Sequence, residues 1–322
     1  MLLSFVGILS YKNSGRMRQV RSQLLSTPHL VEIITAIICG TLSRIATLRE
    51  DYRQYPTFPN GYLNQAVLGF VAALLGAVMV PAVITGNFTA VTFLALAIRQ
   101  FQAVRQLEQK SLLLLEDVEY THRGHAYIDG IAKTFEARNY SALSVALVIG
   151  VIMEVMEHNS PLSRVIAGIA GGICVFVLLS RMTKGQIIAD LADVTVAQIH
   201  IRNHELYVDD MFVSNRVGIE RGQEMLTTEG MAVIVKPKHQ HFRVTLDNFG
   251  QRQAILFELT RGLGVKRYHY MRKNYDDGRI AFAIVPIIRD EERMIQIVRH
   301  TPVLETSKKT HSPLRNWVNR HE

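Results

Sequence analysis

Three charged residues lie inside apolar runs, where an ionised side chain is costly. Glu32 and Arg44 stand near the two ends of one run, and Glu154 lies about one turn inside the end of another. Glu32 and Arg44 are about twelve positions apart, roughly 18 Å along a helix axis, so they cannot pair with each other. Intramembrane charges often mark ion pathways, but charges near the ends of a span commonly extend toward the interface. Extension toward the interface is the favoured interpretation. If the charges instead serve an ion pathway, Glu32, Arg44 and Glu154 are the candidate intramembrane charges.

Five histidines in the second half of the chain are the other residues that could bind a metal. They are His200, His204, His239, His241 and His269. No carboxylate or cysteine stands at a standard ligand offset from them, and nearby lysines disfavour a cation, so a solvated basic patch is favoured over a metal site. The sequence also contains no nucleophile elbow, Walker loop or His-Glu-x-x-His motif. We therefore expect no metal and no cofactor, name no catalytic residue, and favour a non-enzymatic role.

The candidate charges must be positioned by helices that can cross a membrane. Residues 54–98 carry no charged side chain, and within them Tyr62–Thr85 is long enough for a helix to cross a hydrocarbon core of roughly 30 Å. Backbone groups at that depth cannot pair with water, so the segment must be helical. Phe88–Glu116 reads as one long helix whose apolar part is too short to cross, which predicts an interfacial or partly buried helix. The four predicted spans are Leu30–Leu48, Tyr62–Thr85, Asn139–Met156 and Leu162–Arg181.

From Thr183 onward the pattern changes to short β-rich segments and amphipathic helices. The turn sequence Asn-Tyr-Asp-Asp-Gly at residues 274–278 lies between two β-rich runs and predicts a hairpin. Asp247 or Asn248 can cap one helix, and Asp290 can cap another. The predicted strands are Val194–Ile201, Leu206–Val213, Met231–Val235, Phe242–Leu246, Val265–Met271 and Ile280–Ile288, with Val303-Leu304 closing the set. The order of the later elements is that of a ferredoxin-like fold. The predicted fold class is an α-helical membrane unit of about four spans followed by a cytoplasmic α+β domain of ferredoxin-like type.

These patterns divide the chain into four parts. Residues 1–29 form a basic arm, residues 30–182 the membrane unit, residues 183–305 the α+β domain, and residues 306–322 a polar tail expected to be disordered. The formal net charge is +8. Because most basic residues flank the apolar helices or lie in the α+β domain, we expect contact with anionic lipid, no nucleic-acid binding, and both termini in the cytoplasm.

Short segments of the chain carry a family resemblance. Residues 127–132 read Tyr-Ile-Asp-Gly-Ile-Ala and resemble the signature of the YIEGIA family of membrane proteins from endospore-forming bacteria, with Asp129 in place of the family's Glu. The loop that begins Asp51-Tyr-Arg-Gln-Tyr-Pro also resembles a family segment. The motif residues are Tyr127, Ile128, Asp129, Gly130, Ile131 and Ala132, and the loop residues are Asp51, Tyr52, Arg53 and Tyr55. The resemblance implies a role in sporulation, at a membrane such as that of the forespore, and supplies no catalytic residue. From the residues themselves, we expect Gly130 to permit a turn or close packing in a connector at the membrane surface.

Two functions from different classes follow. The leading hypothesis is that the membrane unit holds a cytoplasmic domain that recognises a sporulation protein or a small ligand. The alternative is a transport or ion-pathway function that uses Glu32, Arg44 and Glu154. Self-association into a homo-oligomer is left open.

Overall fold

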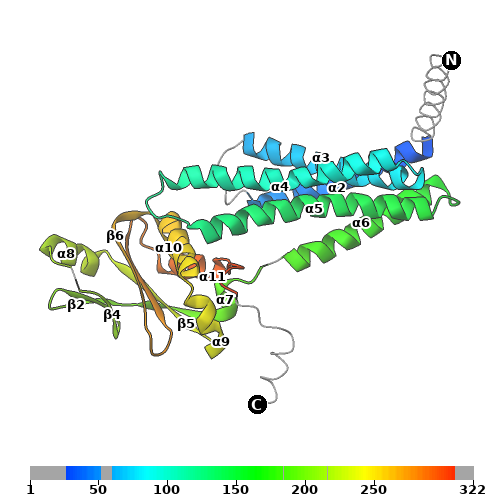
Figure 1. The fold of residues 1–322 in the computed structure, drawn as a ribbon. Helices are drawn as coiled ribbons and strands as arrows, with labels where there is room; N and C mark the ends of the chain where they lie inside the picture. Colours follow the sequence, from blue (N-terminus) through cyan, green and yellow to red (C-terminus); the bar gives the residue numbers. More distant parts are fainter. Residues whose placement is uncertain (1–26, 52–59, 184, 216, 309–322) are drawn as a thin grey trace, which may run out of the picture. The chain divides into compact units, whose positions relative to one another are not determined.

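The computed structural model describes residues 27–51, 60–183, 185–215 and 217–308 (Figure 1). Most of the basic arm, most of the loop after the first span and most of the C-terminal tail lie outside these residues. The described chain forms two compact units. One holds the described residues up to 108 and residues 132–183; the other holds residues 109–131 together with the chain from Gly185 onward. Residues 109–131, which lie between the second and third predicted spans, therefore cluster with the α/β unit.

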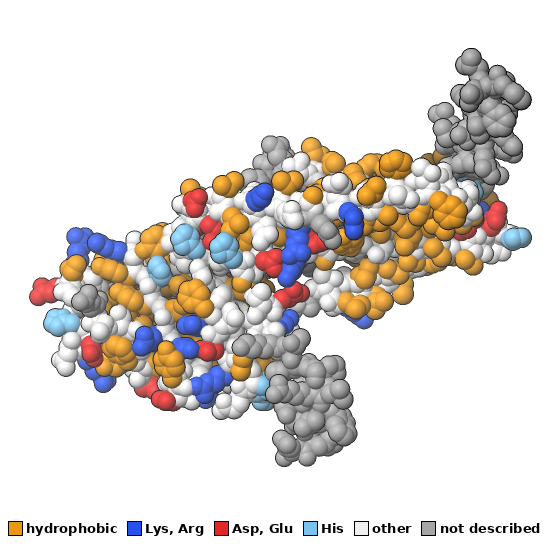
Figure 2. Space-filling model, viewed as in Figure 1, with side chains coloured by type: hydrophobic (Ala, Val, Ile, Leu, Met, Phe, Trp, Pro, Cys, Tyr) orange, Lys and Arg blue, Asp and Glu red, His pale blue; other side chains and the backbone are white. Residues whose placement is uncertain are grey.

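Five long helices form the helical unit. They are α2 (Thr27–Asp51), α3 (Asn60–Ile84), α4 (Phe88–Glu116), α5 (His125–Val155) and α6 (Pro161–Thr183). Four of the described helices are long and apolar enough to span a membrane, at His29–Thr47, Tyr62–Ile84, His125–Val155 and Pro161–Thr183. The four predicted spans are therefore confirmed as candidate membrane helices, and α4 has the bounds that the sequence predicts. On the face seen in Figure 2, apolar side chains gather over these helices, as lipid contact requires.

The helix that contains the third candidate span begins much earlier than the predicted span. Asn139 was expected to start it after a connector, but α5 is helical from His125 and runs through the whole Tyr127–Ala132 segment. Gly130 therefore makes no turn, and a β-carbon added there would meet no atom within 4 Å. The prediction of a connector before the span is wrong. The polar residues of this segment lie on the same continuous helix as the apolar run that follows them.

Small residues let α2, α3 and α5 approach closely. A β-carbon at Gly40 of α2 would lie 2.7 Å from Cβ of Ala73 in α3 and 2.9 Å from the carbonyl oxygen of Ala142 in α5. The shared core of these helices includes Ala36, Ala73, Ala77, Ala146 and Ile149. Helices in lipid associate through packing, so this seam of small residues holds the unit together.

The contacts also fix the direction of each helix within the unit. Phe101 of α4 packs with Ala72 of α3 and with the ring of Tyr140 in α5, while Glu108 accepts a hydrogen bond from Gln65, nearer the start of α3. Residue numbers thus rise along α4 as they fall along α3, which makes α4 antiparallel to α3. Gly76 of α3 approaches Leu143 of α5, and Val80 of α3 approaches Gly150, so α3 and α5 run parallel.

The remaining directions place the two ends of the unit. Arg44 of α2 bonds to Asn139 while His29 lies beside Glu154, so α2 is antiparallel to α5. Gly168 of α6 faces Met153 and Gly172 faces Val145, so α6 is also antiparallel to α5. The start of α2 and the end of α6 therefore lie at opposite ends of the helical unit.

The α/β unit contains two antiparallel sheets in the described residues. The four-stranded sheet has the order β1-β5-β7-β6, and the three-stranded sheet has the order β2-β3-β4. The strands are β1 (Ala192–Ala197), β2 (Ile199–Arg202), β3 (Glu205–Val208), β4 (Met211–Ser214), β5 (Met231–Pro237), β6 (Val265–Lys273) and β7 (Ile280–Pro286). The helices are α7 (Ile188–Leu191), α8 (Glu220–Thr228), α9 (Gln240–Leu246), α10 (Phe249–Leu263) and α11 (Glu291–His300).

The larger sheet is covered on both faces. Val233, Val235 and Phe282 pack against apolar side chains of α9, α10 and α11, while the alternate residues Ile234 and Ala283 pack against α8 and the smaller sheet. This explains why β5 and β7 read as nearly continuous apolar runs. Asn248 and Asp290 cap α10 and α11, as the sequence predicts. Arg279 donates to both carboxylate oxygens of Asp210, at 2.8 and 2.7 Å, which lowers the pKa of that carboxyl and ties β6–β7 to the β3–β4 turn.

Four predicted strands differ in the structure. Val194–Ile201 is divided between β1 and β2, which lie in different sheets, and Leu206–Val213 is divided into β3 and β4 by a turn at Asp209-Asp210. Phe242–Leu246 lies in helix α9, whose apolar side chains Phe242 and Leu246 are spaced four apart and reach the same core. Residues 303–304 form no strand among the described residues; the edge position beside β5 is held by β1, which comes from the N-terminal side of the unit. The element order is thus that of a mixed α/β unit with antiparallel sheets, and it departs from the predicted ferredoxin-like order.

Candidate buried charge site

Glu32 lies in α2, one turn after His29, and its side chain is fully buried. The burial arises because Gly150 of α5 has no side chain: a β-carbon there would stand 3.2 Å from Oε1 of Glu32. The carboxylate therefore points toward α5 and not toward lipid. The side chain is enclosed between helices, and its expected extension toward the membrane interface stays a prediction.

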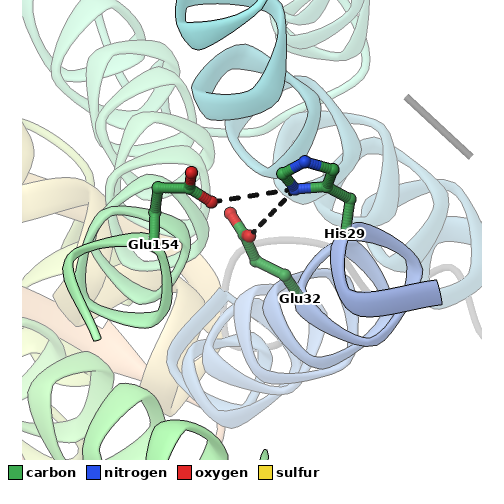
Figure 3. Close-up of side chains that lie close together, drawn as sticks. All are labelled: His29, Glu32 and Glu154. Atoms are coloured by element: carbon green, nitrogen blue, oxygen red, sulfur yellow. Dashed lines mark ion pairs between the residues drawn. The ribbon is translucent and has the colours of Figure 1, made fainter. Parts of the chain in front are cut away.

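Glu154 and His29 complete the cluster (Figure 3). Nδ1 of His29 lies 3.7 Å from Oε2 of Glu32 and 3.7 Å from Oε2 of Glu154. One ligand-capable atom from each of the three side chains lies within 4.8 Å of the other two. The side chains of His29 and Glu154 are 19% and 16% exposed, so the cluster is reached from one end of the helical unit.

The polar atoms of this cluster lack ordinary partners. Neither oxygen of Glu32 has a satisfying hydrogen bond among the described residues, and Nδ1 of His29 and Oε2 of Glu154 are also buried without one. The two carboxyl groups interact with each other, and Arg164 of α6 acts on Glu32 as a positive charge. The Nε of Arg164 is already engaged, because it donates to the carbonyl oxygen of Met153 at 2.9 Å.

This arrangement constrains the protonation of the site. Two carboxylates in contact cannot both stay ionised in a low-dielectric site without a compensating positive charge. Arg164 supplies one positive charge, so a second must come from a proton or a bound cation. A proton or a cation held between the two carboxyl groups would supply this charge.

Arg44 belongs to a second polar network, toward the other end of α2. Its guanidinium donates from Nε to Oδ1 of Asn139 at 3.1 Å and from Nη2 to Oε1 of Gln65 at 2.6 Å. The side chain is only 1% exposed, and its stem lies against Gly69. Arg44 therefore joins α2, α3 and α5 within the unit.

Sequence reasoning finds Glu32, Arg44 and Glu154 but not their partners. The structure brings Glu32 and Glu154 together and keeps Arg44 apart. His29 is not predicted from the sequence. Its spacing of three from Glu32 places both side chains on one helix face, which is the signal that could have identified the His29–Glu32 pair. The side chain of Asp51 and the whole of Tyr52, Arg53 and Tyr55 lie outside the described residues, so the proposed loop site stays a prediction.

The comparisons with known proteins agree with the motif. A family model described as YIEGIA protein matches residues 32–314. The chain belongs to the YIEGIA family. It is 35% identical over 286 residues to the uncharacterized protein YphB of Bacillus subtilis (strain 168), covering 87% of this chain and 94% of that relative. No solved structure matches.

The residues that give the YIEGIA family its name lie on α5, and two of them have clear structural roles. The hydroxyl of Tyr127 donates to Oε1 of Glu258 at 2.5 Å, and its ring meets that of Phe257 edge-on, with centroids 6.1 Å apart. Ile128 is fully buried. Tyr127 thus fastens the first turn of α5 to α10 within the α/β unit, which is an anchoring role.

A pocket lies beside this anchor in the α/β unit of the YIEGIA chain. Its volume is about 780 Å³. Its lining residues come from the segment before α5 and from the start of α10, and include Glu116, His122, Gly124, Asn248, Phe249 and Gln253. Glu116 is held in place because its carboxylate accepts from the backbone N–H groups of Arg123 and Gly124. A pocket of this size can hold a small organic ligand.

Proposed function

We propose that the helical unit handles a proton or a cation at Glu32 and Glu154, and that this exchange is the membrane function of the protein. The observation that carries the proposal is the complete burial of Glu32, a carboxylate without a satisfying partner among the described residues, inside a candidate span. An ionisable side chain inside a span destabilises the protein in the membrane, and in membrane proteins such a group commonly belongs to an ion or proton path. The hydrogen bonds of Arg44 hold α2 against α3 and α5, which keeps the helices that carry Glu32 and Glu154 in place.

The direction of the helices supports a topology with five crossings. Since α3 and α5 are parallel neighbours and both are apolar enough to span, the chain between them must return across the membrane. The connecting helix α4 has 29 residues, or about 43 Å of helix, which suffices. Its apolar half exposes Phe93 and Leu96, as contact with lipid would require, and Arg105 pairs with Glu136 at 3.3 Å. The proposed topology thus puts the start of α2 and the α/β unit on opposite sides, in place of two cytoplasmic termini.

Orientation follows from the basic residues. The α/β unit and the α4–α5 junction carry most lysines and arginines, so we propose that they face the cytoplasm. The His29–Glu32–Glu154 cluster then opens on the opposite side of the membrane.

Ion flux in reconstituted vesicles tests the function. The parent protein should carry protons or a monovalent or divalent cation across the bilayer, and Glu32→Gln should abolish that flux because the amide cannot exchange a proton or balance a cation. Glu157→Gln, an exposed neighbour of Glu154 in the turn after α5, is the matched control and should behave as the parent. A parent protein that carries none of these ions would end the proposal.

A second candidate function is recognition by the α/β unit. The pocket beside the Tyr127 anchor favours it, since a lined cavity of about 780 Å³ could take a small ligand or a side chain of a partner. The implied role in sporulation belongs here as a proposal, at a membrane such as that of the forespore. Crosslinking the full protein in sporulating cells, with Phe249→Ala in the pocket as the comparison, tests it. A crosslink to another protein that Phe249→Ala removes would support recognition, whereas identical patterns would argue against it.

A further inference from the structure

We propose that His29, Glu32 and Glu154 form a binding site for a single divalent first-row transition-metal ion. This proposal rests on the proposed function in that both use the same cluster. It adds the chemical class of the ion that the cluster binds. Its donor set is one imidazole nitrogen and two carboxylates. Ions such as Zn²⁺, Co²⁺ and Mn²⁺ accept this mixture of nitrogen and oxygen donors.

The spacing of the donor atoms is the first argument. Nδ1 of His29 stands 3.7 Å from an oxygen of each glutamate. That distance is too long for a hydrogen bond, so the ring is not held there by donating a proton to either carboxylate. Ligands at about 2.1 Å from one tetrahedral ion lie about 3.4 Å apart, so small side-chain shifts would let all three bind the same ion.

The unsatisfied atoms are the second argument, and they are independent of the spacing. Glu32 is fully buried, and its oxygens and Nδ1 of His29 are all buried without a satisfying partner among the described residues. Buried polar atoms normally find partners, so three side chains whose atoms lack them and converge on one point can together bind a positive species. A proton shared by the two carboxyl groups would satisfy the glutamates but not the imidazole nitrogen; a metal ion would satisfy all three.

The charges around the site are the third consideration. Arg164 is the basic side chain that acts on Glu32, and it offsets part of the negative charge. Its Nε is committed to the carbonyl oxygen of Met153, which holds the guanidinium in a fixed position. Two carboxylates and Arg164 leave a net charge of −1, which a divalent ion changes to +1. A divalent ion exceeds the charge that electrostatics alone would balance, so coordination bonds from the imidazole nitrogen and the carboxylates must supplement the attraction.

Equilibrium binding of Zn²⁺ to the untagged full-length protein in detergent tests the proposal. The parent should bind about one ion per chain with a Kd below about 1 mM. Glu32→Gln, Glu154→Gln and His29→Gln should each weaken binding by at least about 10-fold, the lower bound for disturbing a metal site. Glu157→Gln, exposed and outside the cluster, should bind as the parent does.

A spectroscopic readout separates coordination from loose attraction. Co²⁺ bound to the parent should show visible absorption of a coordinated ion that Zn²⁺ displaces, and Glu32→Gln should lose it. Size-exclusion profiles establish that each variant is folded. If Glu32→Gln fails to fold, Glu154→Gln, at a partly exposed position, replaces it as the test variant. Absence of binding by the parent, or binding that neither glutamate variant weakens, overturns the proposal. Metal binding without flux would reject the transport function alone, and flux without metal binding would reject only the metal site.

Discussion

Replacing Gly76 by alanine should destabilise the helical unit by about 3 kcal/mol, at the upper end of the cost of overpacking. The added β-carbon would run into the backbone carbonyl of Leu143 in α5 and would lie 3.2 Å from Cβ of Ala146. A backbone carbonyl cannot turn aside as a flexible side chain can, so α3 and α5 would have to separate. Thermal unfolding of the detergent-solubilised protein, followed by the loss of its monodisperse peak, measures the effect.

Gly130→Ala is the matched control for this prediction. Gly130 is also a helical glycine, but its added β-carbon meets open space within the described residues, so alanine should be neutral or stabilising by up to about 1 kcal/mol through helix propensity. Equal stability of Gly76→Ala and the parent would contradict the close approach of α3 and α5.

Replacing Arg44 by methionine should also cost about 3 kcal/mol, the lower end of the range for breaking a buried charged network. Methionine keeps much of the stem but removes the donors to Asn139 and Gln65, which are 2% and 9% exposed and cannot turn to water. Leaving these amide oxygens unsatisfied is the main cause of the loss.

Arg181→Met supplies the comparison, because Arg181 is exposed in the last turn of α6. This substitution should change the unfolding temperature little. If both variants unfold with the parent, Arg44 is not the lock between α2, α3 and α5 that its hydrogen bonds indicate.

Much of the architecture can be predicted from local patterns. Charge-free length identifies the strong span, small residues predict close helix packing, and the caps at Asn248 and Asp290 give two helix starts. Each of these signals depends on residues near one another in the sequence. The hairpin of β6 and β7 is predictable for the same reason, because Asp-Asp-Gly lies between two β-rich runs.

The direction of α4 could not be predicted in this way. Its charges at Arg105 and Glu108 argue against crossing when the helix is read alone, but Glu136 of α5 and Gln65 of α3 satisfy them. The same limit applies to the site. Glu32 and Glu154 are recognisable as unusual charges, but their meeting depends on α2 and α5 packing antiparallel through Gly150, a contact between distant parts of the sequence.

Whether α4 crosses with the other helices is measured most directly by cysteine accessibility. In a background with Cys39 and Cys174 replaced by serine, single cysteines at the exposed positions Thr89, Asn159 and Arg221 are labelled in intact cells with a membrane-impermeant maleimide. Thr89→Cys at the start of α4 should label with Asn159→Cys in the α5–α6 turn, and both should lie across the membrane from Arg221→Cys in the α/β unit. Labelling of Thr89→Cys on the same side as Arg221→Cys would contradict five crossings and restore the predicted topology with both termini in the cytoplasm.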